Sequence, residues 1–77
     1  MQIDLVDVTI HIDATLDHSR LDEIEDGLRR LDGVVSVNRQ ENRPHLMVVA
    51  FNPAKVHAHD LLAQVTAQGF HAELIGL

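Results

Sequence analysis

The stretch Val6-Asp7-Val8-Thr9-Ile10-His11-Ile12 alternates apolar and polar side chains along its whole length. A period of two residues is typical of a strand with one buried and one solvent-facing side. We therefore expect Val8, Ile10 and Ile12 to face the core, and His11 to lie on the opposite, open face of a sheet.

Helical spacing follows this strand and returns near the end of the chain. The first helix is predicted to begin after Asp17, a good N-cap, and to stop before Gly33, and its apolar residues are Leu21, Ile24, Leu28 and Leu31. The second is predicted to begin at a cap on His57, with Asp60 as the capping acid, and to end at Gly69.

Three further segments, residues 34–39, 45–51 and 70–75, have strand character, and the polar residues 40–44 predict a turn between the first two. The order is therefore βαββαβ. Right-handed crossovers fold this order into an antiparallel sheet with strands 4-1-3-2 and both helices on one face. We expect an α+β, ferredoxin-like two-layer sandwich that forms a single domain over residues 1–77.

Composition limits the functions that are open to the chain. Its formal net charge is −6 and its only aromatic residues are Phe51 and Phe70, which argues against nucleic acid as a partner. No apolar run approaches the roughly 20 residues that span a bilayer, so we expect no direct membrane insertion and a cytoplasmic location. A phosphate-binding glycine loop and a nucleophile beside a base are both missing, so we expect no enzymatic activity.

Three short passages together resemble the heavy-metal-associated domain family of copper chaperones, periplasmic mercury-binding proteins and metal-transporting P-type ATPases. They are Leu31-Asp32-Gly33-Val34-Val35-Ser36-Val37, Phe51-Asn52-Pro53 and Gln68-Gly69-Phe70-His71-Ala72-Glu73-Leu74. The resemblance implies the sandwich fold and a link to metal transport. It also implies a protein partner, such as a metal-transporting P-type ATPase or the membrane domain of the same chain.

The family's two metal-binding cysteines would fall on Asp17 and Arg20, counted back from Ile24-Glu25-Asp26-Gly27-Leu28. The chain has no cysteine at all. Soft thiolates select monovalent copper, zinc and mercury, whereas a carboxylate next to a permanent cation does not. The simpler interpretation is that Asp17 caps a helix and that Arg20 is solvated.

Six histidines offer a different metal chemistry. Topology places His18, His45 and His71 at one pole of the sandwich, with Asp13 and the end of the His11 strand. Strand parity puts His11, Asp13, His71 and Glu73 on the open face of adjacent strands. We predict a site for a divalent ion (zinc, nickel, cupric or ferrous) with ligands drawn from His11, Asp13, His18 and His71. The alternative is a set of unconnected surface histidines, and His57 and His59 fit helix capping better than metal binding.

Two functions therefore stay open. The first is a cysteine-free relative of the metallochaperone domain that docks to or regulates a transporter and binds a divalent ion. The second is a metal-independent interaction module, for which Leu46, Val48 and Ile75 beside Thr9 provide an apolar patch suited to a homodimer or to another domain.

Overall fold

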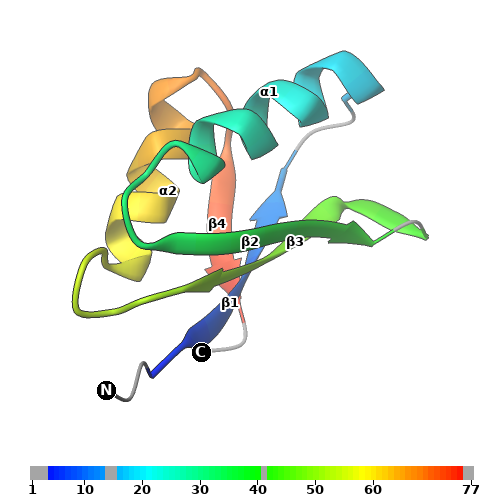
Figure 1. Cartoon of the computed structure of the whole chain (residues 1–77). Coiled ribbons are helices and arrows are strands. Elements are labelled where there is room, and N and C mark those ends of the chain that lie inside the picture. The colour runs from blue at the N-terminus through cyan, green and yellow to red at the C-terminus, as the bar shows by residue number, and fades with distance from the viewer. Residues whose placement is uncertain (1–3, 14–15, 41, 76–77) are drawn as a thin grey trace.

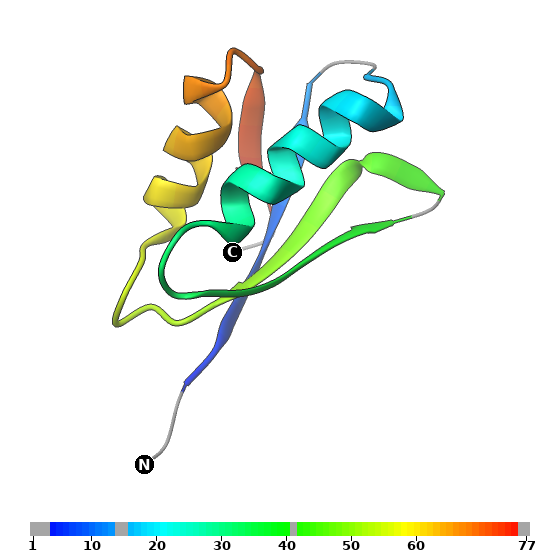
Figure 2. The ribbon, with the colours of Figure 1, turned by 45° about the horizontal axis from the view of Figure 1, so that its top comes forward.

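The computed structural model describes residues 4–13, 16–40 and 42–75. Its elements, in chain order, are β1 (Val6–Ile12), α1 (His18–Arg29), β2 (Val34–Gln40), β3 (Arg43–Phe51), α2 (Ala58–Ala67) and β4 (Ala72–Ile75). The four strands form one antiparallel sheet ordered β2-β3-β1-β4, and both helices cover the same face of it (Figures 1 and 2). This arrangement confirms the predicted ferredoxin-like sandwich and its strand order.

The core lies between the sheet and the two helices. On β1, Val8, Ile10 and Ile12 are at most 1% exposed, whereas Thr9 and His11 between them are half-buried on the other face. The predicted parity of β1 is therefore confirmed. The other core side chains are Leu21, Ile24, Leu28, Val37, Met47, Val49, Phe51, Val56, Leu61 and Val65.

The ends of the helices follow local chemistry. Asp17 is the N-cap of α1, and its Oδ1 accepts a hydrogen bond of 2.9 Å from the backbone N–H of Arg20. The N-cap of α2 is His57, and Asp60, the third residue of the helix, accepts through Oδ2 a hydrogen bond of 2.9 Å from the backbone N–H of His57. Both caps were predicted from the sequence.

Gly33 lies between α1 and β2 with a φ of 104°. A Cβ atom at this position would be 2.8 Å from Cβ of Lys55 and 2.9 Å from Cγ1 of Val56. Glycine is therefore required here for two reasons, the left-handed backbone and the close approach of the segment that leads into α2.

The β2–β3 hairpin differs from its predicted form. Residues 40, 43 and 44 were expected in a turn but belong to the strands, with Gln40 paired to Arg43. The pairing register shifts between Arg39 and Gln40. Polar residues and Pro44 were interpreted as loop signals, but the solvent-facing end of a hairpin needs only backbone pairing and no apolar side chains.

In the part of the chain that is described, no helix is long and apolar enough to cross a membrane.

Candidate functional site

The end of the loop between β1 and α1 caps the helix that follows it. Asp17 is exposed and caps α1, and His18 is the first residue of the helix. The guanidinium Nη1 of Arg20 lies 3.8 Å from Oε2 of Glu23, and both side chains are more than half exposed. The two positions where the resemblance places the family's cysteines thus carry a capping carboxylate and a solvated cation.

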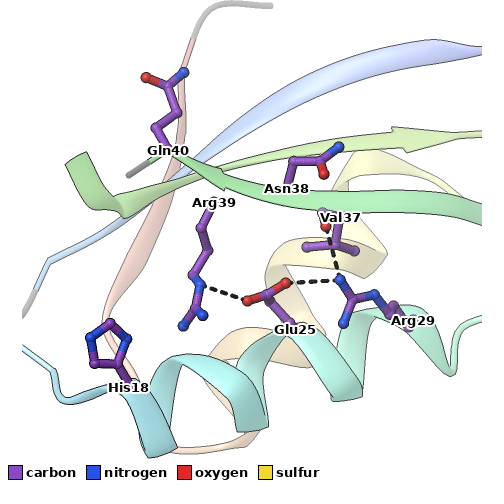
Figure 3. Close-up of a pocket in the computed structure, with 7 residues that line it drawn as sticks. All are labelled: His18, Glu25, Arg29, Val37, Asn38, Arg39 and Gln40. Atoms are coloured by element: carbon purple, nitrogen blue, oxygen red, sulfur yellow. Dashed lines mark hydrogen bonds and ion pairs between the residues drawn. The ribbon is translucent and has the colours of Figure 1, made fainter. Parts of the chain in front are cut away.

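A polar groove of about 670 Å³ lies between α1 and β2 (Figure 3). Glu25 lies at its base with only 9% of its side chain exposed. One carboxylate oxygen of Glu25 accepts a hydrogen bond from Nη2 of Arg29 at 2.9 Å, and the other is 2.7 Å from Nε of Arg39. The residues that line the groove are His18, Glu25, Arg29, Val37, Asn38, Arg39 and Gln40.

These two arginines connect α1 to the edge of the sheet. Nη2 of Arg29 also donates to the backbone carbonyl of Val37 at 3.1 Å, and Nη2 of Arg39 is 3.1 Å from Oδ1 of Asp22. The charges inside the groove are therefore largely compensated by one another. The i,i+4 spacing of Glu25 and Arg29 is visible in the sequence, but the contact with Arg39 comes from a separate element and has no sequence signal.

A different group of side chains gathers around His11, which lies on the open face of the sheet. Glu73 on β4 and Leu46 on β3 are the cross-strand partners of His11. Nδ1 of His11 lies 3.4 Å from Oε1 of Glu73, within ion-pair reach but without hydrogen-bond geometry. The ring of His45 meets the ring of His11 edge to face, with centroids 5.3 Å apart and an interplanar angle of 88°.

The structure brings together some of the four predicted metal ligands. The backbone N–H of Asp13 donates to the carbonyl of His71 at 2.8 Å, so these two exposed residues are cross-strand neighbours next to the His11–Glu73 pair. His18 instead lines the groove between α1 and β2. Within residues 4–13, 16–40 and 42–75, no three His, Asp or Glu side chains are already arranged to hold a metal ion. Metal binding by His11, Asp13, His18 and His71 stays a prediction.

Two residues around His11 were not among the predicted ligands. Strand parity alone placed Glu73 on the open face, so its signal was available in the sequence. His45 was placed only at one pole with the other histidines, because the ring contact between His45 on β3 and His11 on β1 depends on tertiary packing, for which the sequence has no signal.

The predicted apolar patch lies on the same face. Thr9 pairs with Val48 on one side and with Ile75 on the other. Val48 and Leu46 are half-buried, and Ile75 is 40% exposed. The patch therefore adjoins His11 on the central strand β1.

Neither a protein-family model nor a curated protein matches the chain. Solved structures match over most of its length. One is the N-terminal domain of a potential copper-translocating P-type ATPase from Bacillus subtilis in the Cu(I)-loaded state, at 20% identity and a TM-score of 0.85 over 95% of this chain and 90% of that one.

Two further structures match along nearly their full length. Oxidized MerP from Ralstonia metallidurans CH34 has 16% identity and a TM-score of 0.84, over 95% of this chain and 100% of that one. The copper chaperone of Enterococcus hirae has 25% identity and a TM-score of 0.78, over 88% of this chain and 98% of that one. The structural neighbours of this chain are thus heavy-metal-associated-domain proteins, and the chain shares their βαββαβ fold while it lacks cysteine altogether.

Proposed function

We propose that this chain is a non-catalytic docking domain of metal-ion homeostasis, which binds to or regulates a metal-transporting P-type ATPase or a membrane domain of its own chain. The observation that carries the proposal is a fold shared with such domains over nearly the whole chain, combined with a first loop that has lost its thiolates. In this loop Asp17 caps α1 instead. The domain then acts through its surfaces, and not by passing a soft ion through this loop.

The proposal that the loop before α1 does not bind a soft metal ion is tested with monovalent copper. Wild-type protein is expected not to compete with a Cu(I) chelator, because an exposed carboxylate and a guanidinium do not bind a soft cation. The double variant Asp17→Cys/Arg20→Cys restores two thiolates and is expected to compete, with Asp17→Cys alone as the control. Strong competition by the wild-type protein would show that the loop claim is wrong.

The docking claim concerns the exposed acids of α1. Asp22, Glu23 and Asp26 each have about 60% of the side chain exposed, on a chain with a net charge of −6. Complementary charge steers association, so a partner with a basic surface is favoured. Two of the matched structures carry P-type ATPase in their descriptions, which makes such a transporter the first partner to examine.

Binding to the purified soluble domains of the source organism's metal-transporting ATPase is measured by calorimetry. Glu23→Lys is expected to weaken binding clearly, with a larger effect at low salt. The control Ala63→Lys/Thr66→Lys adds the same two charge units to exposed positions of α2 and is expected to have little effect. Equal effects of the two variants, or no binding by the wild type, would contradict the docking claim.

A divalent ion at the pole of the sheet is the second part of the proposal. His11, Asp13 and His71 lie on neighbouring positions of β1 and the β4 edge, and imidazole with carboxylate suits zinc, nickel, cupric or ferrous ions. His18 is on another surface, so we regard it as the weakest of the four predicted ligands.

The alternative function is a metal-independent dimerisation or interaction module. The patch of Leu46, Val48 and Ile75 beside Thr9 favours it, because an apolar surface on an open sheet face suits protein contact. Sedimentation with and without EDTA separates the two functions. A dimer that persists in EDTA would favour the alternative, and a monomer in both conditions would argue against it.

A further inference from the structure

We propose that His11, His45 and Glu73 form a binding site for a divalent transition-metal ion such as Zn²⁺ on the open face of the sheet. The inference rests on the proposed binding of a divalent ion and deepens it, because it names a ligand set that differs from the sequence prediction in two of its three members.

His11 is the fixed member of this set. It lies in β1, which is paired on both sides with β3 and β4, and its side chain is 29% exposed. Its Nδ1 atom is buried and has no hydrogen-bond partner in the described part of the chain. Buried polar atoms are nearly always paired, so an imidazole nitrogen in this state requires an explanation. A metal ion that takes this nitrogen as a ligand provides one.

The separation between His11 and Glu73 has the size that a shared metal ion requires. Two ligand atoms on one tetrahedral zinc ion, each about 2.0–2.1 Å from the metal, are about 3.3–3.4 Å apart. Nδ1 of His11 and Oε1 of Glu73 are 3.4 Å apart and do not form a hydrogen bond. A direct N–H···O hydrogen bond would instead place the two atoms about 2.7–3.2 Å apart.

The separation between His11 and His45 agrees independently. Two imidazole rings that bind one tetrahedral zinc ion have their centroids about 5 Å apart, given a metal–nitrogen distance of about 2.0–2.1 Å. The observed centroid separation is 5.3 Å. In the present edge-to-face arrangement, at 88°, His11, His45 and Glu73 are not yet set to hold an ion, so the His45 ring has to turn to aim a nitrogen at it.

The side chains of Glu73 and His45 are exposed enough to turn toward an ion bound at His11. Glu73 has 67% of its side chain exposed, and His45 is exposed near the end of the hairpin. Two imidazoles and one carboxylate match zinc sites that keep a fourth position open for water. The same set is a poor one for monovalent copper, which prefers thiolate and thioether ligands.

The test is a titration with ZnSO₄ alone, followed by calorimetry and by backbone amide shifts. Both His45→Ala and Glu73→Gln are expected to weaken zinc binding by at least about tenfold, because loss of even a side chain that only supports a metal ligand costs about 10–100-fold in affinity. The matched controls are His59→Ala, on α2, and Glu23→Gln, on α1, and both are expected to bind zinc like the wild type. In the wild type, the amide shifts should centre on residues 11, 45 and 73.

Unchanged zinc affinity in either His45→Ala or Glu73→Gln would overturn this ligand set, as would amide shifts centred on residues 57–60. Both substitutions are at exposed side chains, and far-UV circular dichroism of the metal-free variants checks that the fold is kept. If the wild type binds zinc but these variants do too, only the ligand set fails. If the wild type binds no divalent ion, the ion-binding part of the proposed function fails as well, whereas docking is judged by the separate ATPase measurement.

Discussion

Replacing Glu25 by glutamine removes the negative charge that the two arginines of the α1–β2 groove share. The substitution keeps the size of the side chain, so it leaves no cavity. Its amide NH₂ group, however, must face an arginine donor at one of the two positions where a carboxylate oxygen now lies 2.9 Å from Arg29 and 2.7 Å from Arg39. One favourable contact is lost and one repulsive contact is gained.

The loss in the free energy of unfolding depends on how deeply the ion pairs of Glu25 are buried. Removing one partner of a fully buried ion pair costs about 3–5 kcal/mol. Here Glu25 is 9% exposed, but Arg29 is 52% and Arg39 is 25% exposed, so water screens part of the interaction. Asp22 also lies 3.1 Å from Arg39 and retains that contact. We therefore expect Glu25→Gln to lower the free energy of unfolding by about 1–3 kcal/mol.

The measurement is urea unfolding followed by far-UV circular dichroism, with thermal melts as a second readout. A loss of 1 kcal/mol lowers the Tm of a domain of this size by about 4–8 °C. Glu23→Gln is the matched control, because this carboxylate is 58% exposed and 3.8 Å from its partner Arg20, and it should cost less than about 1 kcal/mol. If Glu25→Gln unfolds at the same urea concentration as Glu23→Gln, the ion pairs of Glu25 with Arg29 and Arg39 do not stabilise the fold.

Two further substitutions test the local structure. Asp17→Ala removes the side-chain acceptor for the N–H of Arg20 and is expected to cost about 1 kcal/mol in the same urea assay, so an unchanged midpoint would show that the cap is dispensable. Gly33→Ala combines a φ of 104° with contacts of 2.8 and 2.9 Å to Lys55 and Val56, and we expect a loss of about 2–5 kcal/mol. Gly69→Ala has a similar φ of 93° but no atom within 4 Å of the added Cβ, so it should cost only about 1–2 kcal/mol, and equal losses at the two glycines would contradict the packing argument.

The fold was predictable because its signals are local and agree with one another. The alternation of β1 predicted which of its side chains are buried. Asp17 marked the start of α1, and Gly33 marked the turn between α1 and β2. Each of these signals depends on residues within a few positions of one another. The hairpin end was predicted less well, since backbone pairing there continues through polar residues that carry no burial pattern.

The side chains of the candidate site were only half predictable. The open face and Glu73 follow from the period of two along paired strands. The contact of His45 with His11 depends on how two side chains meet across β1 and β3, and the contact of Arg39 with Glu25 depends on the distance between a helix and an edge strand. Both are properties of tertiary packing, for which a single sequence offers no periodic signal.

The seam between β1 and β4 joins the two ends of the described chain, with Thr9 opposite Ile75 and His11 opposite Glu73. Pairing across such a long intervening segment must meet a large loop-closure entropy, so β4 is expected to join the sheet after the more local β2–β3 hairpin has formed. A four-residue edge strand held in this way is also the natural place for the native protein to open locally. A ligand that bridges His11 and Glu73 therefore stabilises the pairing of β4 with β1. Its binding is expected to slow hydrogen exchange more at the β4 amides than at amides elsewhere in the chain.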